Sequence, residues 1–533
     1  MKHDDLDIDK NLIESRIIDS LSFVEFILFI EELRGSSIDP ASFGPEVFTS
    51  LRTIGQAFFT DANDDTDIDL NEISEPSLLD VDCTSLEYPL THSQKNWLYY
   101  DECHPELGSW VMPTLLQIRG PLEYSRLEKA LEELTRRHDG LRIQLKGGDV
   151  SGPTQIFIPE FKPDMPVISL EDHAGPDVWQ SILKLINAEC NYPLDPEKGP
   201  PWVAKLIRIS SEHHLLLVAL SHILVDLEAL IEVPYQVAKI YSALGEDSTL
   251  MSIEWPPTQY SQHALWQKDW LESAEGVRQV QHRRKCLNAV KPFNLGAPFR
   301  TQNTKEEAKK VICANVAQLG DNIAAAVHAT PVVVGLAVYA ALLHRHFGHH
   351  EMPVSLVLGF RTSEQSKSTS GVIGCYTNQQ PMVISVEPKA SFLGLVQQIR
   401  EVVLEAFRYR NVPTRLALDE QNPLDSERAA VTFNWMNLLD YEEKLSEVYS
   451  EDTVLEPVIL GIDKPETSLY GGIAHHTALT IRAVRTSEGI SVFLATTKET
   501  LGEKSAELLA DKYVEYYNKL VADPNKSLSE ALA

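Results

Sequence analysis

A histidine and an aspartate follow the most apolar stretch of the sequence, at a spacing that could support proton transfer. Residues 215–220 read L-L-L-V-A-L, which has the length and composition of a strand buried on both faces. Ser221 and His222 follow directly, and Asp226 comes four residues later. An imidazole at the end of a rigid strand, with a carboxylate nearby, can exchange a proton near neutral pH. Structural roles fit as well: Asp226 could cap a helix through Leu230, and His222 could simply bond to its neighbours.

The composition predicts a globular protein of two or three domains. A chain of 533 residues is too long to fold around a single hydrophobic core of ordinary size. No apolar run reaches the length of a membrane span, and the acidic N-terminus lacks the apolar core of a secretory signal. The six cysteines show no pairing or CxxC spacing, which suits a reducing compartment and gives no metal signature. We therefore expect a cytoplasmic protein with no membrane partner and no metal.

The charge excludes one class of partner and is unevenly distributed. A formal net charge of −30 argues against nucleic-acid binding, which requires a basic footprint. Residues 1–85 contain 5 Lys and Arg against 20 Asp and Glu. Half of the chain's net negative charge therefore lies in this short part. Such asymmetry indicates a separate acidic module.

An acidic segment divides the chain into a small N-terminal part and a large remainder. Residues 61–85 are polar and acidic and lack any clear periodicity, so we expect a linker there. Residues 1–60 predict a small helical unit, with helices over about 19–34 and 51–59.

Helices and strands alternate in the remainder, which predicts an α/β protein. The clearest helices are expected at 122–137, 331–348 and 504–521, and a buried strand is expected at 354–359. Mixed α/β layers in two lobes are the architecture that this order favours.

Seven segments of this remainder resemble, in order, the motifs of condensation domains from nonribosomal peptide synthetases. S-H-I-L-V-D-L, which begins at Ser221, resembles the family motif His-His-x-x-x-Asp-Gly. The others are Y-P-L-T-H-S-Q-K-N-W-L (88–98), L-E-E-L-T-R-R-H-D-G-L-R (131–142), Y-P-L-D-P-E-K-G-P-P-W (192–202), P-T-Q-Y-S-Q-H-A-L-W-Q-K-D-W (257–270), T-P-V-V-V (330–334) with Arg361 after it, and I-G-C-Y-T-N-Q-Q-P (373–381).

The resemblance implies a fold and a reaction. It implies two chloramphenicol-acetyltransferase-like lobes in a V-shaped pseudo-dimer, here 86–255 and 256–533, with a tunnel between them. His222 would orient the attacking amine, or less often hydroxyl, and relay its proton while a carrier-bound acyl group is transferred. Asp226 would hold the loop through a buried ion pair, with Arg361 as the first expected partner and Arg142 as the second.

Three departures from the family pattern leave two functions open. Ser221 stands at the family's first histidine, a position that is largely structural. Leu227 replaces a glycine, which predicts a narrower tunnel or a reshaped turn. Ala478 stands where the family often has an aspartate. The chain is thus either an amide-forming acyltransferase or a catalytically silent docking protein that binds carriers or recruits a tailoring enzyme.

Two related enzyme classes fit the motifs less well. A cyclisation domain would need an aspartate where Ser221 stands. Plant-type acyltransferases share His-x-x-x-Asp but also have an Asp-Phe-Gly-Trp-Gly motif, which this sequence lacks.

Residues 1–60 resemble an acyl or peptidyl carrier domain. N-L-I-E-S-R-I-I-D-S-L (11–21) is similar to the carrier pattern in which the serine of Asp-Ser-Leu bears 4′-phosphopantetheine, and this implies attachment at Ser20. Asp19 and Ser20 could instead only cap a helix. Ten residues before Asn11 are too few for the carrier's first helix, so we expect a truncated carrier or a start further upstream.

The resemblance also implies partner proteins. The sequence contains no P-loop, no nucleophile elbow and no dinucleotide motif. We therefore expect it to depend on other carrier domains, on adenylating enzymes of the same pathway and on a phosphopantetheinyl transferase.

Overall fold

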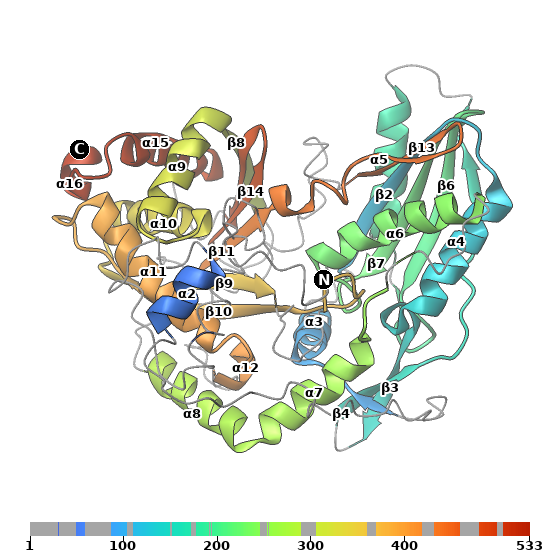
Figure 1. Ribbon diagram of the computed structural model, residues 1–533, viewed down its shortest axis with the longest axis horizontal. Coiled ribbons are helices and arrows are strands. Elements are labelled where there is room, and N and C mark those ends of the chain that lie inside the picture. Colours follow the sequence, from blue (N-terminus) through green and yellow to red (C-terminus); the bar gives the residue numbers. More distant parts are fainter. Residues whose placement is uncertain are drawn as a thin grey trace.

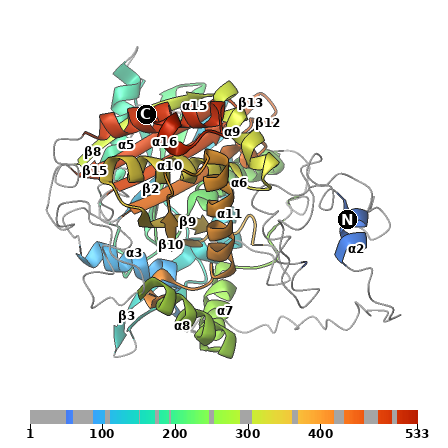
Figure 2. The ribbon, with the colours of Figure 1, turned by 90° about the vertical axis from the view of Figure 1, so that its left-hand side faces the viewer.

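The computed structural model describes most of the chain. The described residues are 30, 50–58, 87–103, 110–149, 152–171, 177–190, 192, 194–245, 253, 255–288, 305–359, 369–417, 431–458, 479–497 and 505–533. Ser20, Arg361, Ala478 and the predicted linker 61–85 lie outside them. Of the predicted carrier unit, helix α2 (Leu51–Phe58) is described, and Figure 2 shows it set apart from both large sheets.

Two six-stranded sheets form the body of the described molecule (Figure 1). The first has the order β12-β13-β2-β7-β6-β5 and the second has the order β10-β9-β11-β14-β15-β8. The first is built from β2 (Val111–Arg119), β5 (Val167–Ser169), β6 (Trp202–Ser210), β7 (His213–Ser221), β12 (Val448–Ser450) and β13 (Thr453–Val458). The second is built from β8 (Lys305–Cys313), β9 (Glu351–Gly359), β10 (Thr377–Ser385), β11 (Val431–Asn437), β14 (Leu479–Thr486) and β15 (Gly489–Thr497).

Helices cover both sheets and connect them. On the first sheet α4 (Tyr124–Arg137) and α6 (Leu227–Gly245) share one core, and α5 (Asp177–Cys190) packs on a second core. The second sheet is covered by α9 (Ala314–Ala326), α10 (Pro331–Phe347), α11 (Phe392–Arg408) and α15 (Ala506–Ala522), with α16 (Leu528–Ala531) beside them. α7 (Tyr260–Glu272) and α8 (Ala274–Asn288) run along the bottom of Figure 1, from the first sheet toward α12 (Thr414–Ala417).

The apolar stretch 215–220 is a central strand buried on both faces, as its sequence predicts. It belongs to β7, which pairs antiparallel with β2 on one side and β6 on the other. Leu216 and Val218 point into the core shared with α4 and α6, whereas Leu215 and Leu217 point into the core under α5. A strand that is hydrogen-bonded along both edges and buried on both faces has little freedom to move. The residue that follows it is therefore held on a rigid support.

The first sheet is completed by a hairpin from the C-terminal half of the chain. The sequence-based division places 448–458 in the second lobe, whereas β12 and β13 extend the first sheet, with β13 antiparallel to β2. Alternating burial along a short strand cannot reveal which sheet edge it joins. The hairpin therefore ties the two parts of the chain together.

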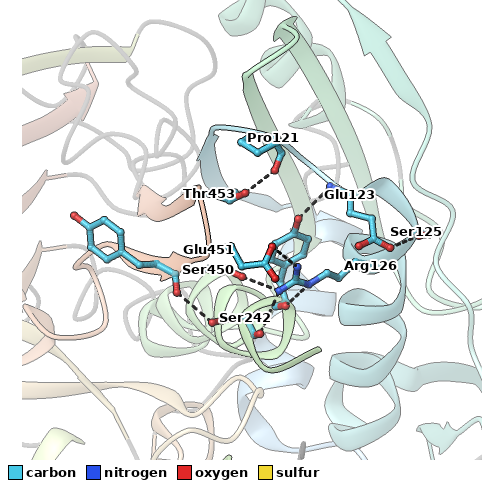
Figure 3. A network of polar contacts seen from close by, with 10 residues as sticks. Pro121, Glu123, Ser125, Arg126, Ser242, Ser450, Glu451 and Thr453 are labelled. Carbon is cyan, nitrogen blue, oxygen red and sulfur yellow. Dashed lines mark hydrogen bonds and ion pairs between the residues drawn. The ribbon is translucent and has the colours of Figure 1, made fainter. Parts of the chain in front are cut away.

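Arg126 fixes the turn of this hairpin to α6 (Figure 3). Its buried guanidinium donates to the carbonyl of Tyr241 (2.7 Å) and to Oγ of Ser450 (2.7 Å), and it lies 4.3 Å from the Tyr241 ring centroid. Thr453 donates to the carbonyl of Pro121 from the same turn. A buried guanidinium needs several acceptors at once. The carbonyls of Tyr241 and Ser242 on α6 meet part of that need, and Ser450 of the hairpin supplies a further acceptor.

A three-stranded sheet packs on the core of the first large sheet, and helix α3 reaches from it to β10 of the second. The small sheet has the order β1-β4-β3, with β1 (Tyr88–Pro89), β3 (Ile143–Asp149) and β4 (Gly152–Phe157). The helix α3 (His92–Cys103) follows β1 directly. Its backbone N–H at His92 donates to Gln267 of α7 (2.8 Å), and Ser93 donates to the carbonyl of Thr377 at the start of β10 (2.6 Å).

Two glycines permit close backbone contact at this junction. A Cβ on Gly140 would lie 2.1 Å from the carbonyl oxygen of Ile373, and one on Gly374 would lie 2.2 Å from the ring of Tyr260. Both distances are far below van der Waals contact. The segment 372–376 can therefore pack against the first sheet's core only because these side chains are absent.

Gly140→Ala should destabilise this junction. The new methyl group must displace the main chain at Ile373, and overpacking of this kind costs about 1–3 kcal/mol. We expect a lower midpoint of thermal unfolding, measured by circular dichroism. Gly199→Ala is the matched control, because no atom lies within 4 Å of its Cβ position. Equal midpoints for the two variants would contradict the close contact.

Candidate active site around His222

His222 lies at the end of β7, with its ring stacked on Trp97. The backbone N–H of His222 donates to the carbonyl of Trp110 (2.6 Å), which continues the ladder between β7 and β2 by one residue. The ring centroids of His222 and Trp97 are 3.8 Å apart at an interplanar angle of 21°. Trp97 comes from α3 and also contacts Trp110, at 4.8 Å between centroids. The imidazole is thus held by a strand end and by an aromatic face.

Asp226 joins α6 to the segment that precedes β10. Its Oδ1 accepts the N–H of Ala229 (3.0 Å), three residues further on, which is the contact of an N-cap residue. Its Oδ2 accepts the N–H of Tyr376 (3.0 Å). A carboxylate at a helix N-terminus is further stabilised by the helix dipole. The capping role that the sequence allowed for Asp226 is therefore present, and the second oxygen adds a contact with a distant segment.

Of the two arginines expected to pair with Asp226, the structure describes only Arg142. Arg361 lies outside the described residues, so that ion pair stays a prediction. The guanidinium of Arg142 donates to the main-chain carbonyls of Thr135 (3.1 Å), Ile158 and Pro159 (3.1 Å). Arg142 therefore fixes the chain after β4, a role that the pairing of opposite charges in the sequence could not indicate.

Burial keeps the His222 ring neutral at physiological pH. It lowers the pKa of His222 to about 4, although hydrogen bonds to main-chain carbonyls of His222 and Val225 and the charge of Asp226 act in the opposite direction. A neutral imidazole has one nitrogen that donates and one that accepts. When one nitrogen donates to a carbonyl, the other is available as an acceptor. The ring can therefore accept a hydrogen bond from an amine or hydroxyl without first losing a proton.

Cys375 lies beside the histidine, a contact that sequence reasoning missed. Its Sγ is 4.0 Å from Nδ1 of His222 and 3.6 Å from Oγ1 of Thr377. Burial raises the pKa of the Cys375 thiol to about 12, so the sulfur is a neutral thiol and not a nucleophile. The cysteine is part of the segment 373–381, but only the structure shows that this segment reaches the end of β7.

Tyr260 supports this segment from the other side. Its hydroxyl donates to the carbonyl of Cys375 (2.9 Å) and lies 2.9 Å from Oγ1 of Thr91. The backbone N–H groups of Tyr260 and Ser261 donate to the buried carboxylate of Asp139, at 3.0 and 3.2 Å. Four of the segments that carry the family resemblance (88–98, 131–142, 257–270 and 373–381) thus meet in one hydrogen-bonded group.

Ser221 and Leu227 have structural positions beside the site. Ser221 ends β7, donates its N–H to the carbonyl of Pro201 (2.9 Å) and accepts the N–H of Leu224 (2.9 Å). Leu227 begins α6 and packs half-buried against the apolar cluster that includes Ile231 and Met436. Among the described residues, positive φ angles at non-glycine positions occur only at His328 and Glu451. The backbone at Leu227 therefore does not take the left-handed φ that favours glycine, and its side chain packs on an apolar surface.

The helices that the structure describes give little sign of a membrane span. Among them no single helix is long and apolar enough to cross a membrane. Of these described helices, only α9 and α10 taken together, which are sharply bent relative to each other, have that length and apolarity. Residues 332–343 of α10 are all buried in the core of the second sheet.

Comparisons with known proteins agree on one family. A family model described as Condensation domain matches residues 84–532. The chain is 24% identical over 347 residues to a linear gramicidin synthase of Brevibacillus parabrevis, covering 64% of this chain and 4% of that protein. It is 27% identical over 329 residues to the beauvericin nonribosomal cyclodepsipeptide synthetase of Beauveria bassiana, covering 61% and 10%. The chain thus spans only a small part of these relatives.

Solved structures agree on the fold. The first condensation domain of the calcium-dependent antibiotic synthetase, in complex with a substrate analogue, matches with a TM-score of 0.66 at 17% identity, covering 84% of this chain and 99% of that one. The starter condensation domain of rhizomide synthetase matches with a TM-score of 0.65 at 17% identity, covering 83% and 98%. The α/β class predicted from the sequence is confirmed, whereas the match leaves the predicted carrier region 1–60 uncovered. From residue 84 onward, the chain belongs to the condensation domain family of nonribosomal peptide synthetases.

Proposed function

We propose that this chain forms an amide bond between a carrier-bound acyl or aminoacyl thioester and an amine acceptor. The observation that carries the proposal is the neutral, buried imidazole of His222, which is fixed by the end of β7 and by the face of Trp97. The enzyme's lobes would form a V, with a tunnel that leads both substrates to this ring. A hydroxyl acceptor, which would give an ester, is the less favoured version of the same reaction.

His222 orients the acceptor in this mechanism. One of its nitrogens accepts a hydrogen bond from the amine, whose nitrogen attacks the thioester carbonyl carbon. The nitrogen becomes strongly acidic once the new C–N bond forms, so even a weakly basic imidazole can take its proton. The carbon–sulfur bond then breaks, and the proton passes to the departing thiolate. A histidine with a pKa of about 4 is suited to this transient relay and not to deprotonating a free amine.

Asp226 is a positioning residue in this proposal. Its two oxygens fix the first turn of α6 and the backbone of Tyr376, which place His222 and Cys375 beside each other. An ion pair with Arg361 would also balance the negative charge of this buried carboxylate.

Leu227 supports one alternative, a silent docking protein of the same fold. Its side chain replaces a glycine and fills space against the cluster with Ile231 and Met436. Side chains in that space would narrow the path of an acceptor. The protein would then bind carriers or recruit a tailoring enzyme without catalysis.

We also propose that residues 1–60 form a carrier domain that bears 4′-phosphopantetheine on Ser20 and that adenylating enzymes supply the acyl groups. A four-domain nonribosomal peptide synthetase bound to AMP and glycine is among the structural matches, with a TM-score of 0.68 at 14% identity, covering 84% of this chain and 34% of that one. The scattered cysteines suit the reducing cytoplasm in which these partners would act.

Replacement of His222 should abolish most of the activity without unfolding the protein. We expect His222→Ala to lower turnover about 10²–10⁴-fold, the range for general acid–base groups. Amide product is followed by mass spectrometry with an acyl-carrier donor of the pathway and an amine acceptor. His213→Ala, at the half-buried start of the same strand, should leave turnover unchanged. Near-normal turnover in His222→Ala would show that the ring does not take part.

The pH profile of the wild type separates a neutral ring from an ordinary histidine. Because burial holds the pKa of His222 near 4, the ring stays neutral as the pH falls from 8 to about 5.5. Turnover with a saturating aromatic amine, itself unprotonated in this range, should therefore stay nearly constant. A fall of about tenfold per pH unit below about 6.5 would indicate an ordinary pKa. No turnover at any pH, with activity restored by Leu227→Gly, would instead support the docking protein.

Ser20 should be the site of phosphopantetheine attachment. Incubation with coenzyme A and a broad phosphopantetheinyl transferase should add one phosphopantetheine to the intact mass, because Ser20 would open a helix whose N-terminal N–H groups can bind the phosphodiester. Ser20→Ala should gain nothing, whereas Ser22→Ala, two residues away, should still be modified. An unmodified wild-type chain with several transferases would contradict the carrier assignment.

A further inference from the structure

A histidine, a cysteine and a glutamate meet on the surface, on two helices that do not contribute to the site around His222. His282 and Cys286 are four residues apart on α8, and Glu405 is on α11. One ligand atom of each residue lies within 4.8 Å of the other two. Cys286 is half-buried, and the other two side chains are exposed, so an ion can enter from solvent.

The donor set and its spacing fit a zinc-type ion. Residues four apart on a helix share a face. Zinc binds imidazole nitrogen at about 2.0–2.1 Å and thiolate sulfur at about 2.3 Å, so a tetrahedral ion holds these two atoms about 3.5 Å apart. The distance from Sγ of Cys286 to Nε2 of His282 is 3.5 Å. An oxygen of the Glu405 carboxylate lies within 4.8 Å of both of these atoms, which makes it the third candidate ligand.

Aromatic and charged neighbours affect the site in opposite ways. The ring of Tyr409 stacks on His282 at 4.8 Å and 15°, which fixes the plane of the imidazole. Arg278 is bonded to Glu275 at 2.6 and 2.9 Å, and the buried Arg283 donates to the carbonyl of Pro381 (2.6 Å). Both guanidinium groups oppose a cation, whereas the thiolate and carboxylate neutralise a divalent ion. A thiolate ligand also selects zinc over magnesium or calcium.

We propose that His282, Cys286 and Glu405 bind one zinc-type ion that clamps α8 to α11, with a solvent molecule as the fourth ligand. This inference is independent of the proposed acyl transfer. It also differs from the absence of a metal expected from the sequence, because cysteine spacing alone does not reveal a His-x-x-x-Cys pair completed by a distant glutamate. The clamp would stabilise the path from α7 to α8, which begins at the Asp139 contacts beside the His222 site.

Cobalt(II) reports on this site directly, because a cysteine ligand gives a thiolate-to-cobalt charge-transfer band in the near ultraviolet. The full chain, reduced and freed of metal by a chelator, is titrated with Co(II) and then with Zn(II). We expect one Co(II) per chain with this band and the visible bands of a tetrahedral ion, and we expect Zn(II) to displace it. Cys286→Ser should lose the band, whereas Cys313→Ser, an exposed cysteine on β8, should keep it.

The other two ligands are tested in the same titration. His282→Ala and Glu405→Gln should each weaken Co(II) binding at least about tenfold, since even outer-shell partners of metal ligands are worth that much. Circular dichroism confirms that each variant is folded. A wild-type chain without the charge-transfer band, or a band that persists in Cys286→Ser, would overturn the proposal. Unchanged affinity in both His282→Ala and Glu405→Gln would overturn it equally.

Discussion

The carboxylate of Asp226 is the contact on which the geometry around His222 depends. One oxygen caps α6, whose first turn follows the histidine by only a few residues, and the other accepts the N–H of Tyr376. These two amides belong to segments about 150 residues apart in sequence, and each is buried. A carboxylate can accept several hydrogen bonds at once, which no other short side chain does as well. The residue therefore sets the distance between the end of β7 and the segment with Cys375.

A second set of contacts repeats this arrangement on the other side of the segment. Asp139 accepts the first N–H groups of α7, and Tyr260 at the start of α7 donates to the carbonyl of Cys375. The glycines at 140 and 374 let these backbones approach. The segment 373–376 is thus fixed from α6 and from α7. This support keeps the His222 ring in place. A fixed position matters for a ring that orients a nucleophile, because a small displacement of a catalytic group greatly lowers the reaction rate.

The elements were more predictable than the contacts between them. The run 215–220 predicted a strand buried on both faces because no polar residue interrupts it, and the helix expected over 331–348 is present as α10. The order of the motifs predicted the family that the matched model shows.

The partners of the site residues depend on tertiary contacts that no local pattern encodes. The resemblance implied Arg142 as the second expected partner of Asp226, but it could not reveal that this guanidinium donates to main-chain carbonyls after β4. The stack of Trp97 on His222 and the position of Cys375 follow from how α3 and the segment before β10 reach the end of β7. The pairing of β13 with β2 had no signal either, since it joins residues more than 300 apart.

Amide hydrogen exchange at Tyr376 tests the central role of Asp226 most directly. We expect Asp226→Ala to speed exchange of the Tyr376 N–H strongly, because its acceptor is lost, while Leu216 and Val218 in β7 keep their protection. Asp226→Asn, which retains one acceptor oxygen, should have a smaller effect. Unchanged exchange at Tyr376 in a folded Asp226→Ala protein would contradict this role, because the segment beside His222 would then be held without this carboxylate.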